Sequence, residues 1–472
     1  MNRFYITAFL CLFGFGVLAH PWKPAHYIIV DTDCGFDDYR AICMLLAAPD
    51  IRVLGIVASN GVLDAKTGYG KVNSLLGDLH HEGILTGINY AGADPKNCFH
   101  ADNFSWGKDT ESVNNVLSAK QLVEDILGNI KEPVDYVCLG SLGTVKQLYP
   151  ESALFRENIR SIIWSSDFPG DKNDFNNKLD EEAFQFVNEK AGMPLKIISA
   201  GEAPFSYDTL IIDKIGDIGT PYAEKISSSF GISRSPFARS FFDERIPVFL
   251  ARNDLFEVDT LHQFIHFQML QADKAKIEDC IIRLAAGYQG NQNQVLSGFP
   301  LDTTFYQADI RQIMDVTIKK YGLEEWIAGV MANELHRHLG VYAIIGTKMG
   351  IRAREYFGSG VDEMKIISYA GIVPPFSCMN DGLQVSTGAT LGHGLIDIAR
   401  DSVILPEAEF VYMGRTIRVC LKEKYREKIK REISTYRIVY GLSSDMYWEM
   451  VRNAALNYWM NWNRYEIFTI KI

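Results

Sequence analysis

The chain has 472 residues, and its content of 47% hydrophobic and 22% charged residues is typical of a globular protein. This length exceeds what one ordinary hydrophobic core supports, so we expect two domains. The formal net charge of -11 at pH 7 argues against a nucleic-acid-binding protein, which would need a broad basic surface, and favours a small neutral or cationic ligand.

The first residues have the pattern of a secretory signal peptide. Arg3 precedes an apolar stretch at residues 4–18, and Ala19 ends a plausible small-residue cleavage site before His20. The stretch is short for a membrane span, and no later segment reaches about 18 uninterrupted apolar residues. We therefore expect a signal peptide at residues 1–19 and a secreted or periplasmic protein that does not stay in a membrane; the alternative is a short buried helix or a retained anchor.

Short β-branched runs alternate with helical patterns from Tyr27 to about Ala200. The predicted strands are residues 27–30, 51–58, 134–139, 159–164 and 195–199, and the predicted helices are residues 39–48, 112–129 and 180–191. Such a βαβ series predicts an α/β fold with a mostly parallel sheet and helices on both faces. In such sheets the ligand binds at the carboxyl ends of the strands.

The second half of the chain has a different pattern. From about Gln263 to Tyr321 it is predominantly helical, and a second unit begins near Leu323. Residues 409–421 read as a hairpin around Met413 and Gly414, and helices are predicted from Lys422 and over residues 444–462. We expect a first domain over residues 26–322 and an α+β domain over residues 323–472.

An acidic octet, DTDCGFDD at residues 31–38, follows the first predicted strand. Carboxylate oxygens are the usual ligands of hard cations, and Gly35 permits the tight turn that would bring Asp33 and Asp38 around one ion. The alternative is that Asp37 and Asp38 only stabilise the positive amino terminus of the next helix.

The octet resembles the DxDxGxDD signature of the inosine-uridine preferring nucleoside hydrolase family, the N-ribohydrolases. Further segments resemble family blocks in the same order: Asn60 after the second strand, LGSLGT at residues 139–144, DFN at residues 174–176 and FDE at residues 242–244. The resemblance covers roughly residues 26–320 and implies the family's α/β fold.

The resemblance also implies a metal site and a catalytic residue. It places calcium between the carboxylates of Asp33, Asp38 and Asp243 and the carbonyl of Gly143, where the family has threonine. Asp33 would touch both metal and water and act as the general base. A backbone carbonyl needs no particular side chain, so the change to Gly143 is tolerable.

The same resemblance implies how a nucleoside would be held. The ribose would be oriented by Asp37, Asn60, Asp174 and Asn176. Phe242 stands where the family often has histidine, and an apolar ring cannot protonate a leaving group. Phe242 could instead stack on a base or fill the pocket wall.

Two later segments resemble the domain family named after the E-type component of formylmethanofuran dehydrogenase. HRHLGVYAIIGTKMG at residues 336–350 is similar to HGHLCPG...G.RMG, and residues 378–394 are similar to CxxDxxQxxTGCTxGKG. The side chains that could hold a transition metal such as zinc are His336, His338, Cys378 and His393. The alternative is that the histidines only satisfy buried polar groups.

Together these features predict a secreted, calcium-dependent hydrolase that cleaves the N-glycosidic bond of nucleosides or related ribosides. Two alternatives stay open: a non-catalytic nucleoside- or ribose-binding protein, and a metal-binding protein whose second domain carries the function. The expected partner is a small nucleoside or riboside, and the chain could also form a homo-oligomer.

Overall fold

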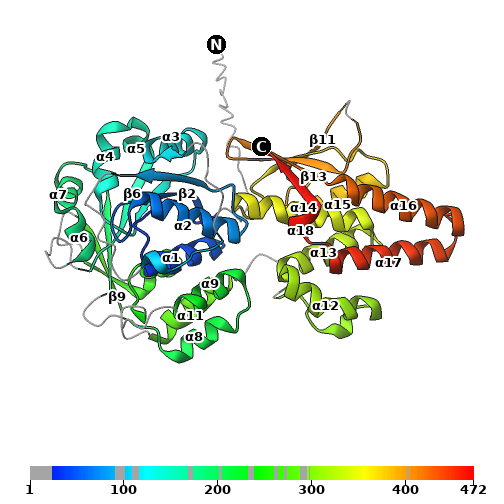
Figure 1. Cartoon of the computed structure of the whole chain (residues 1–472), viewed down its shortest axis with the longest axis horizontal. Coiled ribbons are helices and arrows are strands. Elements are labelled where there is room, and N and C mark those ends of the chain that lie inside the picture. The colour runs from blue at the N-terminus through cyan, green and yellow to red at the C-terminus, as the bar shows by residue number, and fades with distance from the viewer. Residues whose placement is uncertain are drawn as a thin grey trace, which may run out of the picture.

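The computed structural model describes residues 24–90, 101–108, 116–167, 174–200, 205–231, 239–259, 264–270, 274–287, 295–296, 298–400 and 403–472. The predicted signal peptide at residues 1–19 lies outside these ranges. Two units, each with its own sheet, lie side by side (Figure 1). Among the described residues, no helix is both long enough and apolar enough to cross a membrane.

The first unit is built on a sheet of nine strands in the described part of the chain, in the order β4-β3-β2-β1-β5-β6-β7-β9-β8. The strands are β1 (His26–Thr32), β2 (Ile51–Ser59), β3 (Leu85–Asn89), β4 (Leu117–Ser118), β5 (Val134–Cys138), β6 (Ile159–Ser165), β7 (Leu195–Ser199), β8 (Phe256–Asp259) and β9 (Ile265–Met269). All neighbours are parallel except β8 and β9. Successive strands run outward in both directions from β1 and β5, so the strand order reverses there, and a ligand site is expected at that point.

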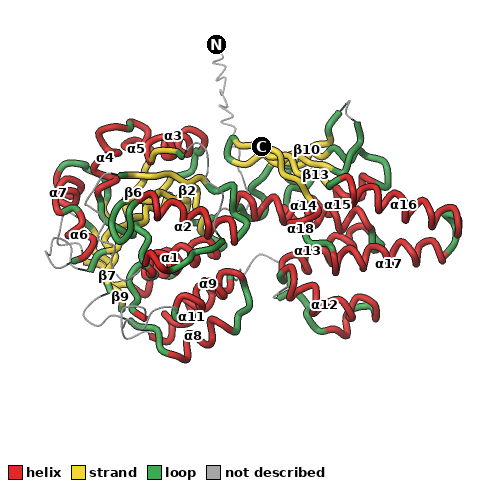
Figure 2. The backbone as a smooth tube through the Cα atoms, in the orientation of Figure 1, coloured by secondary structure: helices red, strands yellow, loops and turns green. Residues whose placement is uncertain are grey.

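Helices cover both faces of this sheet (Figure 2). They are α1 (Phe36–Ala47), α2 (Ala65–Asp78), α3 (Ala119–Asn129), α4 (Gly143–Glu151), α5 (Ala153–Asn158), α6 (Phe175–Leu179), α7 (Glu181–Glu189), α8 (Thr209–Gly216), α9 (Pro221–Ser229), α10 (Arg245–Ala251) and α11 (Lys274–Ala286). Ile28 and Val30 of β1 enter one apolar core, whereas Tyr27 and Ile29 enter the core on the opposite face. This alternation follows from the period of two in a strand, and it confirms the predicted two-faced, mostly parallel sheet.

All five predicted strands are present, with ends that differ by at most two residues. The prediction of a helical region from Gln263 was wrong at its start, because Ile265–Met269 forms β9 beside β7. The predicted helix over residues 112–129 was wrong at residues 117 and 118, which form β4; residues 112–115 lie outside the described part. There the Ser118 hydroxyl accepts a hydrogen bond from the Gln121 N–H at 3.2 Å, and this cap starts α3 only at Ala119.

The second unit contains a mixed sheet whose five strands, in the described residues, follow the order β11-β10-β12-β13-β14. These are β10 (Lys365–Ser368), β11 (Ile396–Ile398), β12 (Glu407–Tyr412), β13 (Arg415–Leu421) and β14 (Phe468–Lys471). Its helices are α12 (Ala308–Tyr321), α13 (Leu323–His336), α14 (Val341–Phe357), α15 (Met379–Thr387), α16 (Glu423–Tyr440), α17 (Asp445–Asn461) and α18 (Arg464–Ile467). The predicted hairpin is confirmed: β12 and β13 pair antiparallel, and Met413 and Gly414 both have positive φ, as a type I′ turn requires.

The boundary between the units was expected after residue 322, and this stays a prediction. Ile310, Ile313 and Met314 of α12 lie in the apolar core of the second unit, which places that helix with the C-terminal sheet. The core itself is organised around α14, which is buried along almost its whole length and packs on α13, α15 and α17.

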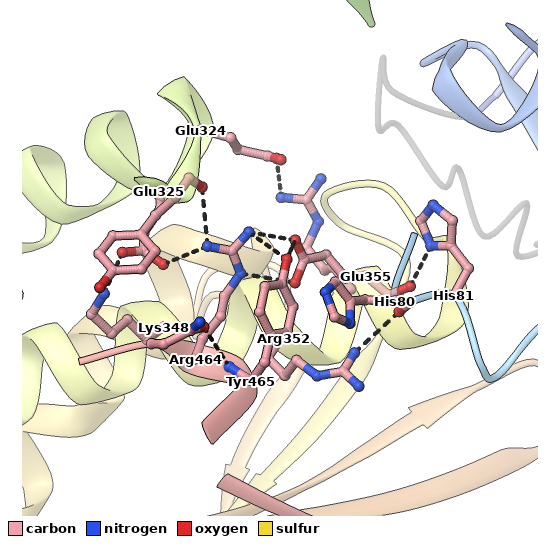
Figure 3. Close-up of polar contacts among 12 residues, drawn as sticks. His80, His81, Glu324, Glu325, Lys348, Arg352, Glu355, Arg464 and Tyr465 are labelled. Carbon is pink, nitrogen blue, oxygen red and sulfur yellow. Dashed lines mark hydrogen bonds and ion pairs between the residues drawn. The ribbon is translucent and has the colours of Figure 1, made fainter. Parts of the chain in front are cut away.

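Polar contacts join the two units (Figure 3). The segment after α2 lies against the end of α14: His81 Nδ1 is 2.6 Å from the Glu355 carbonyl, and the Gly83 N–H donates to the Tyr356 carbonyl at 2.8 Å. Arg52 of β2 forms a nearly buried ion pair with Glu363 at 2.8 Å. The first sheet and its site are therefore attached directly to the second unit.

Candidate active site

The acidic octet forms the connection between β1 and α1. Cys34 has a φ of 68°, which turns the chain sharply, and Gly35 caps the helix that begins at Phe36. Asp38 accepts hydrogen bonds from the Gly35 N–H at 3.0 Å and from the Thr32 hydroxyl at 2.5 Å. The helix start therefore fixes the Asp38 carboxylate at the point where the strand order reverses.

Three carboxylates meet beside this turn. Asp37, Asp38 and Asp243 each offer an oxygen, and these oxygens lie within 4.8 Å of one another. Asp38 and Asp243 are buried and Asp37 is half-buried. Two like charges about 4 Å apart repel by roughly 4 kcal/mol at an effective dielectric constant near 20, so a cation is needed to hold all three ionised. Among the described residues this is the one group of three acidic, histidine or cysteine side chains with such spacing.

The chemistry of these donors fits a hard divalent cation. Oxygen ligands suit calcium, whereas a zinc site usually includes nitrogen or sulfur. Asp38 and Asp243 were both predicted as ligands. The structure adds Asp37, which the sequence had assigned to the sugar, and leaves Asp33 just outside the group. Gly143, the predicted carbonyl ligand, begins α4, and its N–H donates to the Ser141 hydroxyl at 3.2 Å.

Asp33 lies beside the cluster and shares a hydrogen bond with Asp38. Its carboxylate accepts the Val62 N–H at 3.2 Å. A Cβ added at Gly61 would lie 2.3 Å from an Asp33 oxygen, and one added at Gly140 would lie 3.0 Å from the Asp33 Cβ. The connections after β2 and β5 can close on Asp33 only because both positions are glycine, a requirement that sequence reasoning missed.

Burial has a strong effect on these acids. It raises the pKa of Asp33 and of Asp243 well above the ordinary carboxyl range, and it raises the pKa of Asp37 to about 7. Neighbouring carboxylates add to each shift: Asp38 acts on Asp33 and Asp37, and Asp37 acts on Asp243. Without a cation, these carboxyls therefore keep protons near neutral pH.

The predicted sugar-binding residues Asn60, Asp174 and Asn176 all hold loops at this edge of the sheet. The hydrogen bonds are Asn60 Nδ2 to the Tyr90 carbonyl at 3.1 Å, Ala65 N–H to Asn60 Oδ1 at 2.9 Å, Asn177 N–H to Asp174 Oδ1 at 2.8 Å, Asp167 N–H to Asp174 Oδ2 at 2.9 Å, and Asn176 Nδ2 to the Leu139 and Ser165 carbonyls at 2.6 and 2.9 Å. Backbone partners thus already engage these side chains, and a role toward a sugar stays a prediction.

The segment that carries Asp243 is fixed by its two charged neighbours, which sequence reasoning missed. Glu244 forms a fully buried ion pair with Arg40 of α1. Arg245 pairs with Asp167, and it donates to the Ser165 hydroxyl at 3.1 and 3.2 Å. Phe242 is half-buried just before them. Neither charge belongs to a quoted motif, so the only sequence signal was the run of charged residues after Phe242.

The predicted transition-metal ligands of the second unit make other contacts. His336 Nδ1 lies 2.7 Å from Asp381 Oδ2, and the rings of His336 and His338 are 4.3 Å apart. His393 lies 3.3 Å from Asp362. Across the described part of the chain, these residues form no group of three at metal-ligand spacing, so a transition-metal site that includes Cys378 stays a prediction.

Comparison with known proteins identifies both units. Residues 28–241 match the family model "Inosine-uridine preferring nucleoside hydrolase". Residues 335–469 match the family model "FmdE, Molybdenum formylmethanofuran dehydrogenase operon". No curated protein matches the chain.

Several solved structures resemble the first unit. The inosine-uridine preferring nucleoside hydrolase from Bacillus anthracis is 16% identical, with a TM-score of 0.46, over 56% of this chain and 100% of its own. A plant nucleoside hydrolase is 13% identical, with a TM-score of 0.48, over 56% and 99%. A purine-preferring ribonucleoside hydrolase from Gardnerella vaginalis is 15% identical, with a TM-score of 0.47, over 55% and 98%. On the two family matches, the chain carries an inosine-uridine preferring nucleoside hydrolase domain at residues 28–241 and an FmdE domain at residues 335–469.

Proposed function

We propose that the chain is a calcium-dependent N-ribohydrolase that uses water to cleave the N-glycosidic bond of nucleosides or related ribosides. One observation carries the proposal: a nucleoside hydrolase domain has three convergent carboxylates, Asp37, Asp38 and Asp243, beside the buried Asp33 at the reversal of its strand order. Their oxygen donors suit calcium, and their mutual repulsion is relieved by a divalent cation.

Each acid then has a role. Asp37, Asp38 and Asp243 would hold the ion, with the Gly143 carbonyl as a further ligand implied by the family resemblance. Calcium bound there would make a coordinated water more acidic and bind ribose hydroxyls. Asp33 accepts the proton of the attacking water, which adds to the sugar as the glycosidic bond breaks through an oxocarbenium-like state.

The departing base must leave without help from residue 242. Phe242 has no proton to donate, and its ring is half-buried. The best substrates should therefore be ribosides whose base is a good leaving group without protonation by that side chain. This constraint concerns the base and leaves the roles at the ribose unchanged.

Two observations favour a second candidate function, a nucleoside receptor without turnover. Phe242 replaces the usual acid, and Asn60 and Asp174 already bind backbone groups. Such a protein would keep the cation and the ribose contact but release no product.

A panel of purine and pyrimidine nucleosides separates the two functions. Purified protein with calcium should release reducing sugar from at least one member, and EDTA should abolish the release. Calorimetry should be run on the same panel. Binding of a nucleoside without release of sugar would favour the receptor, and calcium-loaded protein that neither binds nor cleaves any member would refute both functions.

Calcium affinity should fall as the pH is lowered from about 8 to about 5, because the ion must displace protons from acids with raised pKa values. The pKa of Asp37 is raised by burial and neighbouring acids to about 7, and those of Asp33 and Asp243 are raised further above their ordinary value. Isothermal titration in buffers of different ionisation enthalpy should show proton release on binding. An affinity that is the same across this pH range would contradict the burial of these acids.

Thermal stability should show the same linkage with the opposite sign. A carboxyl whose pKa is raised on folding stabilises the folded state below its unfolded pKa, and this contribution is lost as the pH rises through the folded pKa. For Asp37 that window runs from about 4 to about 7. The Tm difference between calcium-loaded and EDTA-treated protein should therefore widen as the pH rises through this window.

We also propose that the protein is secreted or periplasmic. The apolar stretch at residues 4–18 and the small residues before His20 support this. Amino-terminal sequencing of protein exported from cells expressing the whole chain should begin at His20.

A further inference from the structure

A buried ion pair joins the two segments that supply the acid cluster. Arg40 lies on α1, two residues after Asp38, and Glu244 directly follows Asp243. The Arg40 guanidinium donates to the Glu244 carboxylate, and the two side chains are 1% and 0% exposed. They are 204 residues apart in the sequence.

Further contacts fix both ends of this pair. Arg40 donates to the Ser240 carbonyl at 3.2 Å, so α1 holds the segment at two points. The second Glu244 oxygen accepts the Phe242 N–H at 3.1 Å. Rings of Phe230 and Tyr207 lie 4.9 and 5.6 Å from the guanidinium carbon. The pair therefore has little freedom to move.

A buried ion pair is often no more stabilising than an apolar pair of the same size, so stability alone is a weak reason to keep one. What an apolar pair would lose here is direction. Asp243 must stay within 4.8 Å of Asp37 and Asp38 although the three carboxylates repel one another. Only a directional contact between α1 and residues 240–244 opposes that repulsion at the point where it acts.

We propose that the Arg40–Glu244 pair is a positioning device that holds Asp243 against Asp37 and Asp38 and sets the backbone of Phe242. The proposal rests on the proposed function insofar as that cluster binds calcium. The two residues touch neither ion nor substrate, and they act through Asp243 and Phe242. They are positioning residues that the family resemblance does not assign.

The test is an apolar double variant, Arg40→Met with Glu244→Leu, which removes both charges together and leaves no unpaired buried ion. Its matched control is Arg160→Met with Asp135→Leu. Asp135 is 1% exposed and pairs with Arg160 in the same sheet, but both lie near the amino-terminal ends of β5 and β6, away from the cluster. Both double variants and the unaltered chain are titrated with calcium, and their calcium-free crystal structures are compared.

The positioning variant should bind calcium about 10–100-fold more weakly, as expected when a supporting contact of a metal ligand is lost. Its Asp243 oxygens should leave the 4.8 Å group in the calcium-free crystal. The control should bind calcium within about twofold of the unaltered chain, because it does not touch the cluster. An intact cluster with unchanged calcium affinity in the positioning variant would overturn the proposal.

The crystal structure separates this proposal from the proposed function. If the unaltered chain binds no calcium, the proposed function fails, whereas the position of Asp243 in the variant still decides the role of the pair. If the apolar variant does not fold, Arg40→Lys replaces it. That change keeps the charge but loses the fork that reaches both Glu244 and the Ser240 carbonyl, so the same displacement of Asp243 is expected.

Discussion

The Asp33→Ala protein should lose nucleoside hydrolysis by about 10²–10⁴-fold or more, which is the range for removing a general base. Asp33 is buried, shares a hydrogen bond with Asp38 and receives the Val62 N–H. No other carboxylate can take its place without leaving the cluster at Asp37, Asp38 and Asp243. We also expect calcium binding to be lost or strongly weakened, because the change removes the partner of Asp38.

Two further variants make this measurement specific. Asp33→Asn keeps the volume and the Val62 contact but cannot accept a proton, so turnover should fall while the fold stays intact. His338→Ala changes an exposed side chain of the FmdE domain and should leave hydrolysis and calcium affinity unchanged. Full turnover by Asp33→Ala protein would show that the general base had been wrongly assigned.

The sheet could be predicted where burial leaves a simple pattern. β1, β2 and β5 are covered on both faces, so each is a nearly continuous apolar run whose strand character is visible in the sequence alone. β9 was missed because Ile265–Met269 alternates apolar and polar residues at the less buried side of the sheet. Short segments of that kind are decided by which strand lies beside them, here β7.

The site divides in the same way. The octet at residues 31–38 carries its own turn and helix cap, so its geometry is local and a sequence motif captures it. The Arg40–Glu244 pair depends on two segments that meet only in the folded chain. The hydrogen bonds of Asn60 and Asn176 likewise depend on where distant carbonyls lie. Residue type could be predicted at such positions, but the partner could not.

Arg464→Met should reduce the free energy of unfolding by about 3–5 kcal/mol, the usual cost of breaking a buried ion pair from one side. The Arg464 guanidinium is 7% exposed and binds Glu355 at 2.6 and 2.9 Å, Glu325 at 2.9 Å and the Tyr321 carbonyl at 3.0 Å (Figure 3). Burial by itself raises the pKa of Glu355, yet Arg464 outweighs it and holds that pKa below its ordinary value. Without Arg464, Glu355 becomes a poorly compensated buried charge.

The matched control is Arg452→Met. Arg452 also binds a carboxylate, Asp309, at 2.5 Å, but both side chains are about one-third exposed, so the expected loss is below about 1 kcal/mol. Urea unfolding of the two variants should show this difference, and equal losses would contradict the role assigned to burial.

The effect of Arg464→Met should also reach the nucleoside hydrolase domain. The Glu355 carbonyl contacts His81, and the ring of Tyr465 stacks on His80 at 3.4 Å, so the residues around Arg464 hold the segment that follows α2. Amide hydrogen exchange at residues 80–84 should therefore quicken in Arg464→Met and stay unchanged in Arg452→Met. Unchanged exchange in both variants would mean that the first domain keeps this segment in place by itself, and that the FmdE domain is attached to it without supporting it.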